Sequence, residues 1–199
     1  MIGVCKKKKM PHPIVFVGPS GIGKGTIIGK LRELYPGRFD FSVSHTTRQP
    51  REGETNGVQY HFVTREKFQE MIKNGEFLEH ADIHGNCYGT TFAAIHQVES
   101  TGKICILDVN IDGAMAVYKS EMTPFIILLK PTSFEALEAR LRGRGTETEE
   151  QIQRRLQTTR RELQLYEENK EMFDLTIIND RLEDTLNKII EELLKRYKL

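Results

Sequence analysis

The sequence contains no tryptophan, only three cysteines and no apolar run that approaches the length of a membrane span. Cys5, Cys87 and Cys105 are odd in number and widely spaced, which fits neither a disulfide framework nor a zinc pattern and predicts a reducing, cytoplasmic location. A transmembrane helix needs about 20 apolar residues, so no membrane segment is expected. Behind the lysine run at 6–9 there is no apolar stretch, so residues 1–12 are interpreted as a flexible tail and not as a signal peptide.

An excess of charge of one sign is also missing. The 29 basic and 28 acidic residues give a net charge of +1, which offers no global argument for binding a nucleic acid or a membrane. The six histidines form no pair at ligand spacing near a carboxylate or thiol, so no metal held by side chains alone is expected. A chain of 199 residues suits one compact domain with small inserts. Any electrostatic function must therefore come from local clusters of charge.

Short apolar runs alternate with longer amphipathic segments, without an internal repeat. This pattern predicts an α/β fold, and continuous apolar runs predict a parallel sheet that is covered by helices on both faces. Strands are expected at 13–17, 104–107, 125–129 and 175–178, and helices at 24–34 and 182–194.

Two regions interrupt this pattern. Residues 44–95 are polar and contain an alternating piece at 58–63, which indicates a small mixed sheet inserted into the core. Residues from about 140 to 161 are dense in arginine and glutamate with two glycines between, and form either two solvated helix ends joined by a turn or a mobile lid, which is placed at 136–155. The predicted core domain then consists of residues 13–43, 96–135 and 156–199.

A glycine-rich segment, GPSGIGK, follows the first predicted strand and precedes a predicted helix at residues 18–24. This is the pattern of a P-loop, in which backbone N–H groups surround a polyphosphate and the lysine reaches the β- and γ-phosphates. Gly25 occupies the position where P-loops usually have a Mg²⁺-binding hydroxyl, so magnesium must be held mainly by phosphates and water. The predicted ATP-binding residues are Gly18, Ser20, Gly21, Ile22, Gly23, Lys24, Gly25 and Thr26.

Several motifs then follow in order: SVSHTTRQPREGE at 42–54, NG at 56–57 with Tyr60, GEFLE at 75–79, GNCYGT at 85–90, ILD at 106–108 and LRGRGTE at 141–147. Together with the P-loop they resemble the guanylate kinase family over essentially the whole chain from residue 13 onward. The resemblance implies a P-loop kinase fold with a GMP-binding insert and a helical lid. It also implies transfer of the γ-phosphoryl group of MgATP to GMP, and to dGMP, in purine nucleotide metabolism.

The predicted acceptor site contains an arginine pair. Arg48 and Arg51 lie three residues apart in a turn-prone stretch, where two guanidinium groups can hold a dianionic monophosphate through bidentate bonds. The resemblance implies that the hydroxyls of Tyr60 and Tyr88 assist them and that a carboxylate and two hydroxyls recognise guanine. Asp108 ends an apolar strand, where ligands bind in open α/β sheets, and is expected near metal-bound water. The implied GMP-binding residues are Ser44, Arg48, Arg51, Tyr60, Glu79, Tyr88, Thr90 and Asp108.

The resemblance implies further arginines in the lid, which close over the transferred phosphoryl group. The catalytic residues so implied are Lys24, Arg48, Arg140, Arg144 and Arg155, with no general base. Asn110 departs from the family pattern, because many members carry an aspartate there. Two rival interpretations stay open: a catalytically inactive interaction module of a scaffold protein, and a kinase for another monophosphate such as AMP. The sequence does not distinguish a monomer from a homodimer.

Overall fold

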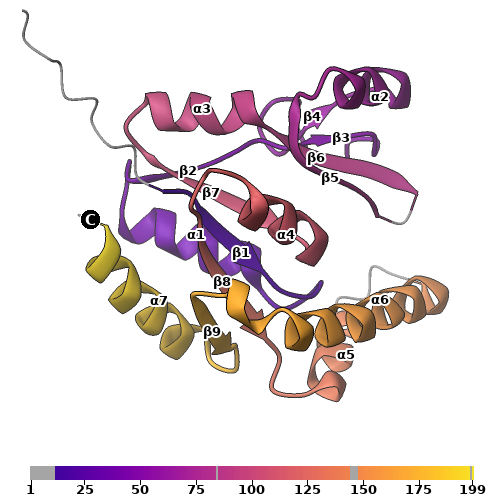
Figure 1. The fold of residues 1–199 in the computed structure, drawn as a ribbon. Helices are drawn as coiled ribbons and strands as arrows, with labels where there is room; N and C mark the ends of the chain where they lie inside the picture. The colour runs from indigo at the N-terminus through magenta and orange to yellow at the C-terminus, as the bar shows by residue number, and fades with distance from the viewer. Residues whose placement is uncertain (1–11, 84, 144–147, 198) are drawn as a thin grey trace, which may run out of the picture.

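The computed structural model describes residues 12–83, 85–143, 148–197 and 199. Its core is a five-stranded sheet in the order β2-β7-β1-β8-β9, in which all neighbouring strands run parallel (Figure 1). The predicted parallel sheet is therefore confirmed. The strands are β1 (Ile14–Val17), β2 (Phe39–Phe41), β7 (Ile104–Val109), β8 (Phe125–Lys130) and β9 (Leu175–Ile178).

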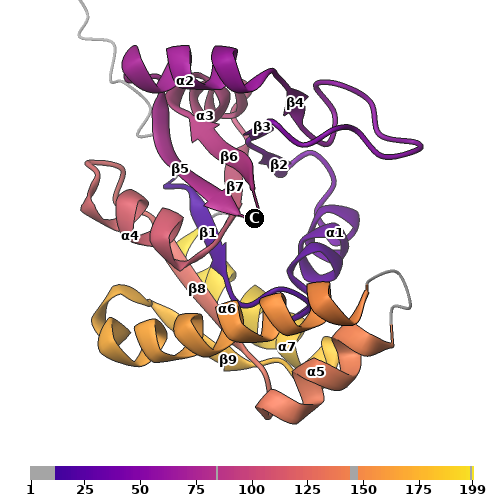
Figure 2. The ribbon, with the colours of Figure 1, turned by 90° about the vertical axis from the view of Figure 1, so that its right-hand side faces the viewer.

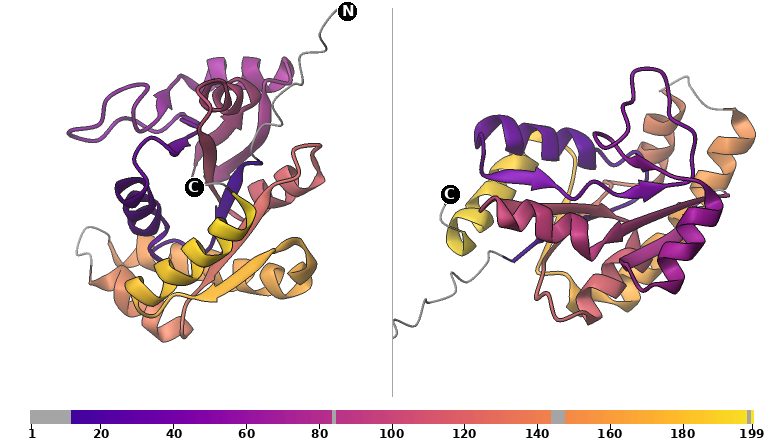
Figure 3. Two further views of the ribbon diagram at one scale, coloured as in Figure 1. Left: turned by 90° about the vertical axis from the view of Figure 1, so that its left-hand side faces the viewer. Right: turned by 90° about the horizontal axis from the view of Figure 1, so that it is seen from above.

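Helices cover both faces of this sheet, as the apolar runs predict. Side chains alternate along a strand, so Ile14 and Phe16 face α1 (Lys24–Leu34) and α7 (Leu182–Arg196). Val15 and Val17 face α3 (Phe92–Ser100), α4 (Ile111–Lys119) and α6 (Glu149–Glu168). The view from above in Figure 3 shows the indigo α1 and the yellow α7 side by side on their face of the sheet. Because both faces are buried, every residue of β1 is apolar and inaccessible to solvent.

A second, smaller sheet has the order β4-β3-β6-β5 and mixes one parallel pair with two antiparallel pairs. Its strands are β3 (His45–Thr46), β4 (His61–Phe62), β5 (Phe77–Ile83) and β6 (Asn86–Thr91). Helix α2 (Arg65–Lys73) packs on it through Phe68 and Met71. Figure 2 shows this sheet together with α2 and α3 at the top, away from α5 and α6. The predicted mixed sheet is thus confirmed.

The alternating segment at 58–63 is a strand only at its end, so that prediction is partly wrong. Gly57 donates its N–H to the carbonyl of Tyr60, which closes a turn, and Val58 is 62% exposed. Alternation here reflects a surface turn that leads into a two-residue strand. Helix α3 also crosses the predicted boundary at residue 95, because Ile95 and Val98 pack into the core on one face of that helix.

Helices α5 (Phe134–Arg142) and α6 border the segment predicted as a lid. Helix α6 continues unbroken past residue 155, through the predicted boundary between lid and core. The lysine run at 6–9 lies outside the described residues. His12, which the prediction placed in the flexible tail, accepts a hydrogen bond from the hydroxyl of Tyr197 at 3.1 Å. Within the described ranges, no helix is both long and apolar enough to cross a bilayer.

Candidate active site

The P-loop joins the end of β1 to the start of α1. Gly23 forms the N-cap of α1 with φ +100°, a left-handed conformation that favours glycine. At Gly18 a Cβ would lie only 2.6 Å from the carbonyl oxygen of Leu129, so a side chain has no room there. The loop therefore depends on glycine both for its backbone shape and for its close approach to β8. It presents the positive end of the α1 dipole, which suits an anionic ligand.

Lys24 lies at the start of α1 beside an acidic residue of the neighbouring strand. Strands β1 and β7 pair in register, so that Asp108 lies opposite Phe16 near the end of the strand that leads into the loop. The Lys24 ammonium donates to the carbonyl of Gly18 at 2.5 Å and lies 3.6 Å from the Asp108 carboxylate. Surrounding protein raises the pKa of Asp108, and the charge of Lys24 opposes this shift. The sheet register thus places a carboxylate beside the P-loop lysine.

Two of the three predicted lid arginines contact this region. Arg155 of α6 donates to the hydroxyl of Ser20 at 2.6 Å, and Arg140 of α5 donates to the carbonyl of Asn179 at 3.2 Å. The side-chain amide of Asn179 in turn donates to the P-loop carbonyl of Ile22 at 2.6 Å. Arg144 lies outside the described residues. Arg140 and Arg155 are therefore already held at the edge of the loop.

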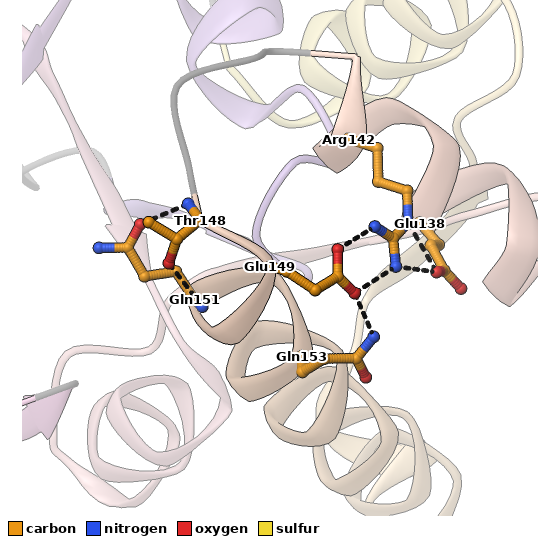
Figure 4. A network of polar contacts seen from close by, with 6 residues as sticks. All are labelled: Glu138, Arg142, Thr148, Glu149, Gln151 and Gln153. Carbon is orange, nitrogen blue, oxygen red and sulfur yellow. Dashed lines mark hydrogen bonds and ion pairs between the residues drawn. The ribbon is translucent and has the colours of Figure 1, made fainter.

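The ends of α5 and α6 are tied together by ion pairs. Arg142 binds Glu138 on its own helix and Glu149 at the start of α6, and Gln153 donates to Glu149 at 2.8 Å (Figure 4). Thr148 and Gln151 form a capping box at the start of α6, which satisfies its first N–H groups. These contacts make α5 and α6 one connected unit beside the P-loop.

In the region predicted to bind the acceptor, Arg48 lies among aromatic rings. Its guanidinium group is 5.5 Å from the ring centre of Tyr60 and bonds Glu54 at 2.9 Å. Tyr88 stands edge-on to Tyr60, with ring centres 5.8 Å apart. Glu54 also accepts the backbone N–H of Arg51, whose side chain is exposed. The structure thus brings Arg48, Tyr60 and Tyr88 together, and Glu54 connects them to Arg51.

A buried carboxylate lies deeper in the second sheet. Glu79 is 8% exposed, and burial raises its pKa, while the neighbouring Thr90 opposes this shift. The hydroxyls of Thr90 and Ser44 are hydrogen-bonded at 3.0 Å. The β5-β6 register shifts between Phe77 and Glu79, and this irregularity sets where the Glu79 side chain points. The carboxylate can accept two N–H donors. One hydroxyl proton is already used between Ser44 and Thr90, and donation to a carbonyl oxygen falls to the other hydroxyl or requires this bond to open.

Asn110 has a structural role. It is the N-cap of α4, and its side-chain oxygen accepts the backbone N–H of Gly113 at 2.9 Å. The helix cap thus engages one of the two lone pairs of this oxygen. An aspartate at this position could form the same cap.

Comparison with known proteins identifies the family. A family model described as "Guanylate kinase" matches residues 10–197. The chain belongs to the guanylate kinase family. "Guanylate kinase" of Sus scrofa is 45% identical over 190 residues, which cover 94% of each chain. "Guanylate kinase 1" of Oryza sativa subsp. japonica is 52% identical over 181 residues, 89% of this chain but 47% of that protein. This chain thus spans about half the length of the rice protein.

The fold agrees with this assignment. The crystal structure of guanylate kinase from Anaplasma phagocytophilum aligns with a TM-score of 0.71 and 29% sequence identity, over 96% of this chain and 89% of that one. The predicted guanylate kinase resemblance and fold class are confirmed by these findings. Family membership makes the chain a nucleotide-binding transferase of the ATP:GMP phosphotransferase type.

The sequence indicated no role for three polar residues that border this candidate site. Glu54 holds Arg48, Asn179 braces the P-loop, and Glu162 of α6 is half-buried within the electrostatic reach of Lys24. Asn179 could have been found from its position directly after an apolar strand, where parallel sheets place ligand contacts. Nothing in the sequence distinguishes Glu162 from the other glutamates of α6.

Replacing Glu162 with glutamine should change how stability depends on pH. Burial raises the pKa of Glu162 to about 7, against the opposing charge of Lys24, from an ordinary value near 4.5. Because its native pKa is raised, the contribution of Glu162 to the free energy of unfolding is fully present below pH 4.5 and is lost as the pH rises through 7. We expect E162Q to gain about 1–2 kcal/mol relative to the unmodified chain between pH 5 and pH 8, after discounting for partial exposure.

Urea unfolding of both proteins at the two pH values measures this difference. Glu168→Gln on the same helix is the matched control, since Glu168 is exposed. Equal pH profiles for E162Q and the unmodified chain would show that Glu162 is ionised at little cost in the native state.

Proposed function

We propose that the chain transfers the γ-phosphoryl group of ATP to GMP, giving ADP and GDP, and that dGMP is also an acceptor. One observation supports the assignment of the site: Asp108 interacts both with the P-loop half of the site, at Lys24, and with the acceptor half, at Tyr60. It lies 3.6 Å from Lys24 of the P-loop. Burial raises the pKa of Tyr60 on the proposed acceptor side, and the charge of Asp108 adds to this shift. Donor and acceptor phosphates bound to these two halves would therefore meet beside Asp108.

In the proposed reaction an oxygen of the GMP phosphate attacks the γ-phosphorus in line, and the bond to the β-phosphate oxygen of ADP breaks. The second pKa of a phosphate monoester is about 6, so this nucleophile is largely ionised at neutral pH and needs no general base. Catalysis then depends on positioning and on neutralising charge. Lys24 would serve the β- and γ-phosphates, and Arg48 and Arg51 would hold the acceptor phosphate.

Arginines of the lid complete the proposed charge distribution. Arg140 and Arg155 already lie at the edge of the P-loop, bonded to Asn179 and Ser20. A small movement of α5 and α6 would transfer these guanidinium groups to phosphate oxygens and exclude water from the reacting atoms. We propose that residues 136–155, including Arg144, act as this lid, that 44–95 bind GMP and that 13–43, 96–135 and 156–199 form the ATP-binding core.

The residues around the P-loop fit a magnesium ion held by phosphates and water. Gly25 leaves open space where P-loops usually have a hydroxyl, and nothing lies within 4 Å of a Cβ built there. Asp108 would accept hydrogen bonds from metal-bound water, since its side chain is 37% accessible and lies beside Lys24. When bound, Mg²⁺ neutralises charge on the β- and γ-phosphates.

Guanine selectivity is proposed to come from the second sheet. The buried Glu79 carboxylate can accept the N1–H and N2–H₂ donors of guanine, and a hydroxyl of Ser44 or Thr90 can donate to O6. Adenine presents an acceptor at N1 and a donor at N6, so it would leave these buried groups unpaired.

The proposal predicts ADP production from MgATP that depends on the acceptor. GMP and dGMP should support turnover, whereas AMP, CMP and UMP offered separately should support at least about 10³-fold lower kcat/KM, because a mismatched base leaves buried polar groups unpaired. A coupled assay for ADP measures each rate. Folded protein without turnover on any acceptor would contradict the proposal and favour an interaction module, and turnover on AMP would contradict the assignment of Glu79.

The cellular setting is proposed from the sequence. A cytoplasmic location agrees with Cys87 and Cys105, which are both buried and free. Small-molecule substrates are the proposed partners, and either a monomer or a homodimer is compatible with them.

A further inference from the structure

Helix α4 approaches the Glu79 carboxylate at a glycine. A Cβ built on Gly113 would lie 2.9 Å from Oε2 of Glu79, 3.1 Å from Cβ of Val109 and 3.3 Å from Oδ1 of Asn110. Packed protein interiors do not accommodate a carbon atom 2.9 Å from a carboxylate oxygen without a displacement. Any other residue at position 113 would therefore push the carboxylate aside.

The backbone itself does not require glycine here. Gly113 lies in the first turn of α4 with ordinary helical geometry, and its N–H is already satisfied by Asn110. Alanine has a higher helix propensity than glycine, so this position lowers the intrinsic stability of α4. The contact with Glu79, and not the conformation of the chain, explains the glycine.

Only the end of the Glu79 side chain can move away from an atom added at position 113. Its backbone pairs with Thr90 in the second sheet, and the preceding Leu78 packs against the core cluster that includes Ala114 and Val117 of α4. Strand and helix are thus held at a fixed separation, whereas the carboxylate can rotate about its side-chain bonds. An added methyl group should displace the carboxylate and leave the fold intact.

We propose that Gly113 is a specificity-determining residue of the acceptor site. By lacking a side chain, it leaves the Glu79 carboxylate in the position from which both oxygens can accept the N1–H and N2–H₂ groups of guanine. This inference rests on the proposed function, which assigns Glu79 to the base. It extends that function by placing the rear wall of the guanine pocket on the first turn of α4.

Gly113→Ala tests the inference through selectivity. IMP is the informative second acceptor, because its base has N1–H and O6 but lacks the 2-amino group. We expect G113A to lower kcat/KM for GMP by about 30-fold and the GMP-to-IMP ratio of kcat/KM by about tenfold, with most of the loss in KM for GMP. The KM for MgATP should stay within about twofold. A purely structural role of Gly113 would not change the ratio between two acceptors.

Gly29→Ala is the matched control, since Gly29 lies within α1 and nothing is within 4 Å of a Cβ built there. It should leave the ratio unchanged. Glu79→Gln and the double variant E79Q/G113A complete a cycle, in which G113A should have little further effect on the ratio once the carboxylate is gone.

The outcomes distinguish an error in the proposed function from an error in the inference about Gly113. Unchanged selectivity in E79Q would contradict the assignment of Glu79 in the proposed function. Lost selectivity in E79Q together with an unchanged ratio in G113A would overturn the inference about Gly113 alone. Failure of G113A to fold, seen as a lost thermal transition, would also overturn it, because the glycine would then serve packing against Val109.

Discussion

Lys24→Met should lower kcat by about 10³-fold, the loss expected when one preorganised charge is removed from a transition state. The lysine begins α1 at the P-loop, and its ammonium group is held by Gly18 and Asp108 within reach of the proposed phosphate site. Methionine keeps a similar length and apolar stem but removes the charge. Steady-state kinetics with saturating GMP and MgATP measures the effect.

Two controls keep that result specific. Lys30→Met changes an exposed lysine of the same helix that forms an ion pair with Glu33, and should retain full activity. Equilibrium binding of GMP to the Lys24 variant should remain within a few fold of the unmodified chain, since the lysine serves the donor side. Near-normal turnover of K24M would contradict the assigned role.

Arg48→Met should lower kcat/KM for GMP by about 10²–10³-fold, mostly through KM. The guanidinium group lies between Tyr60 and Glu54, so it is preorganised to bind a phosphate with two hydrogen bonds. Loss of a charge-assisted bidentate contact costs about 3–4 kcal/mol when the site is partly buried, which corresponds to this range. Initial rates over a GMP concentration series provide the measurement.

Arg65→Met is the comparison for this variant, because Arg65 also belongs to the second-sheet region but pairs with Asp82 at an exposed position. It should leave the kinetics unchanged. An Arg48 variant with unaltered KM for GMP would place the acceptor phosphate elsewhere in the protein.

The core of the fold was predictable because its signal is local. Buried parallel strands such as β1 and β8 are continuous apolar runs, and the P-loop marks the junction of β1 with α1. The second sheet was harder to delimit, because strands of two residues such as β4 carry almost no periodicity. Helix α6 crosses a boundary that composition suggested, since its charged outer face hides an apolar inner face.

The parts of the candidate site that belong to local sequence motifs could be predicted. The parts that depend on contacts between residues far apart in the sequence could not. Nothing in sequence spacing indicates that His45 stacks on His61 at 4.7 Å. Burial, together with the nearby charge of His61, lowers the pKa of His45 to about 4. The roles of Asn179 and Gly113 likewise depend on partners 157 and 34 positions away, at Ile22 and Glu79. Such roles follow from tertiary packing and not from local pattern.

Four cations around the P-loop and the proposed acceptor site have protein partners in the described structure. Lys24 is held by Gly18, Arg48 by Glu54, Arg155 by Ser20 and Arg140 by Asn179. A phosphate that enters must displace these oxygens, so its binding exchanges hydrogen bonds instead of adding them. The same oxygens can take the cations back when the products leave. We therefore expect this arrangement to moderate substrate affinity and to favour product dissociation, which suits a kinase that must release two diphosphates in each cycle.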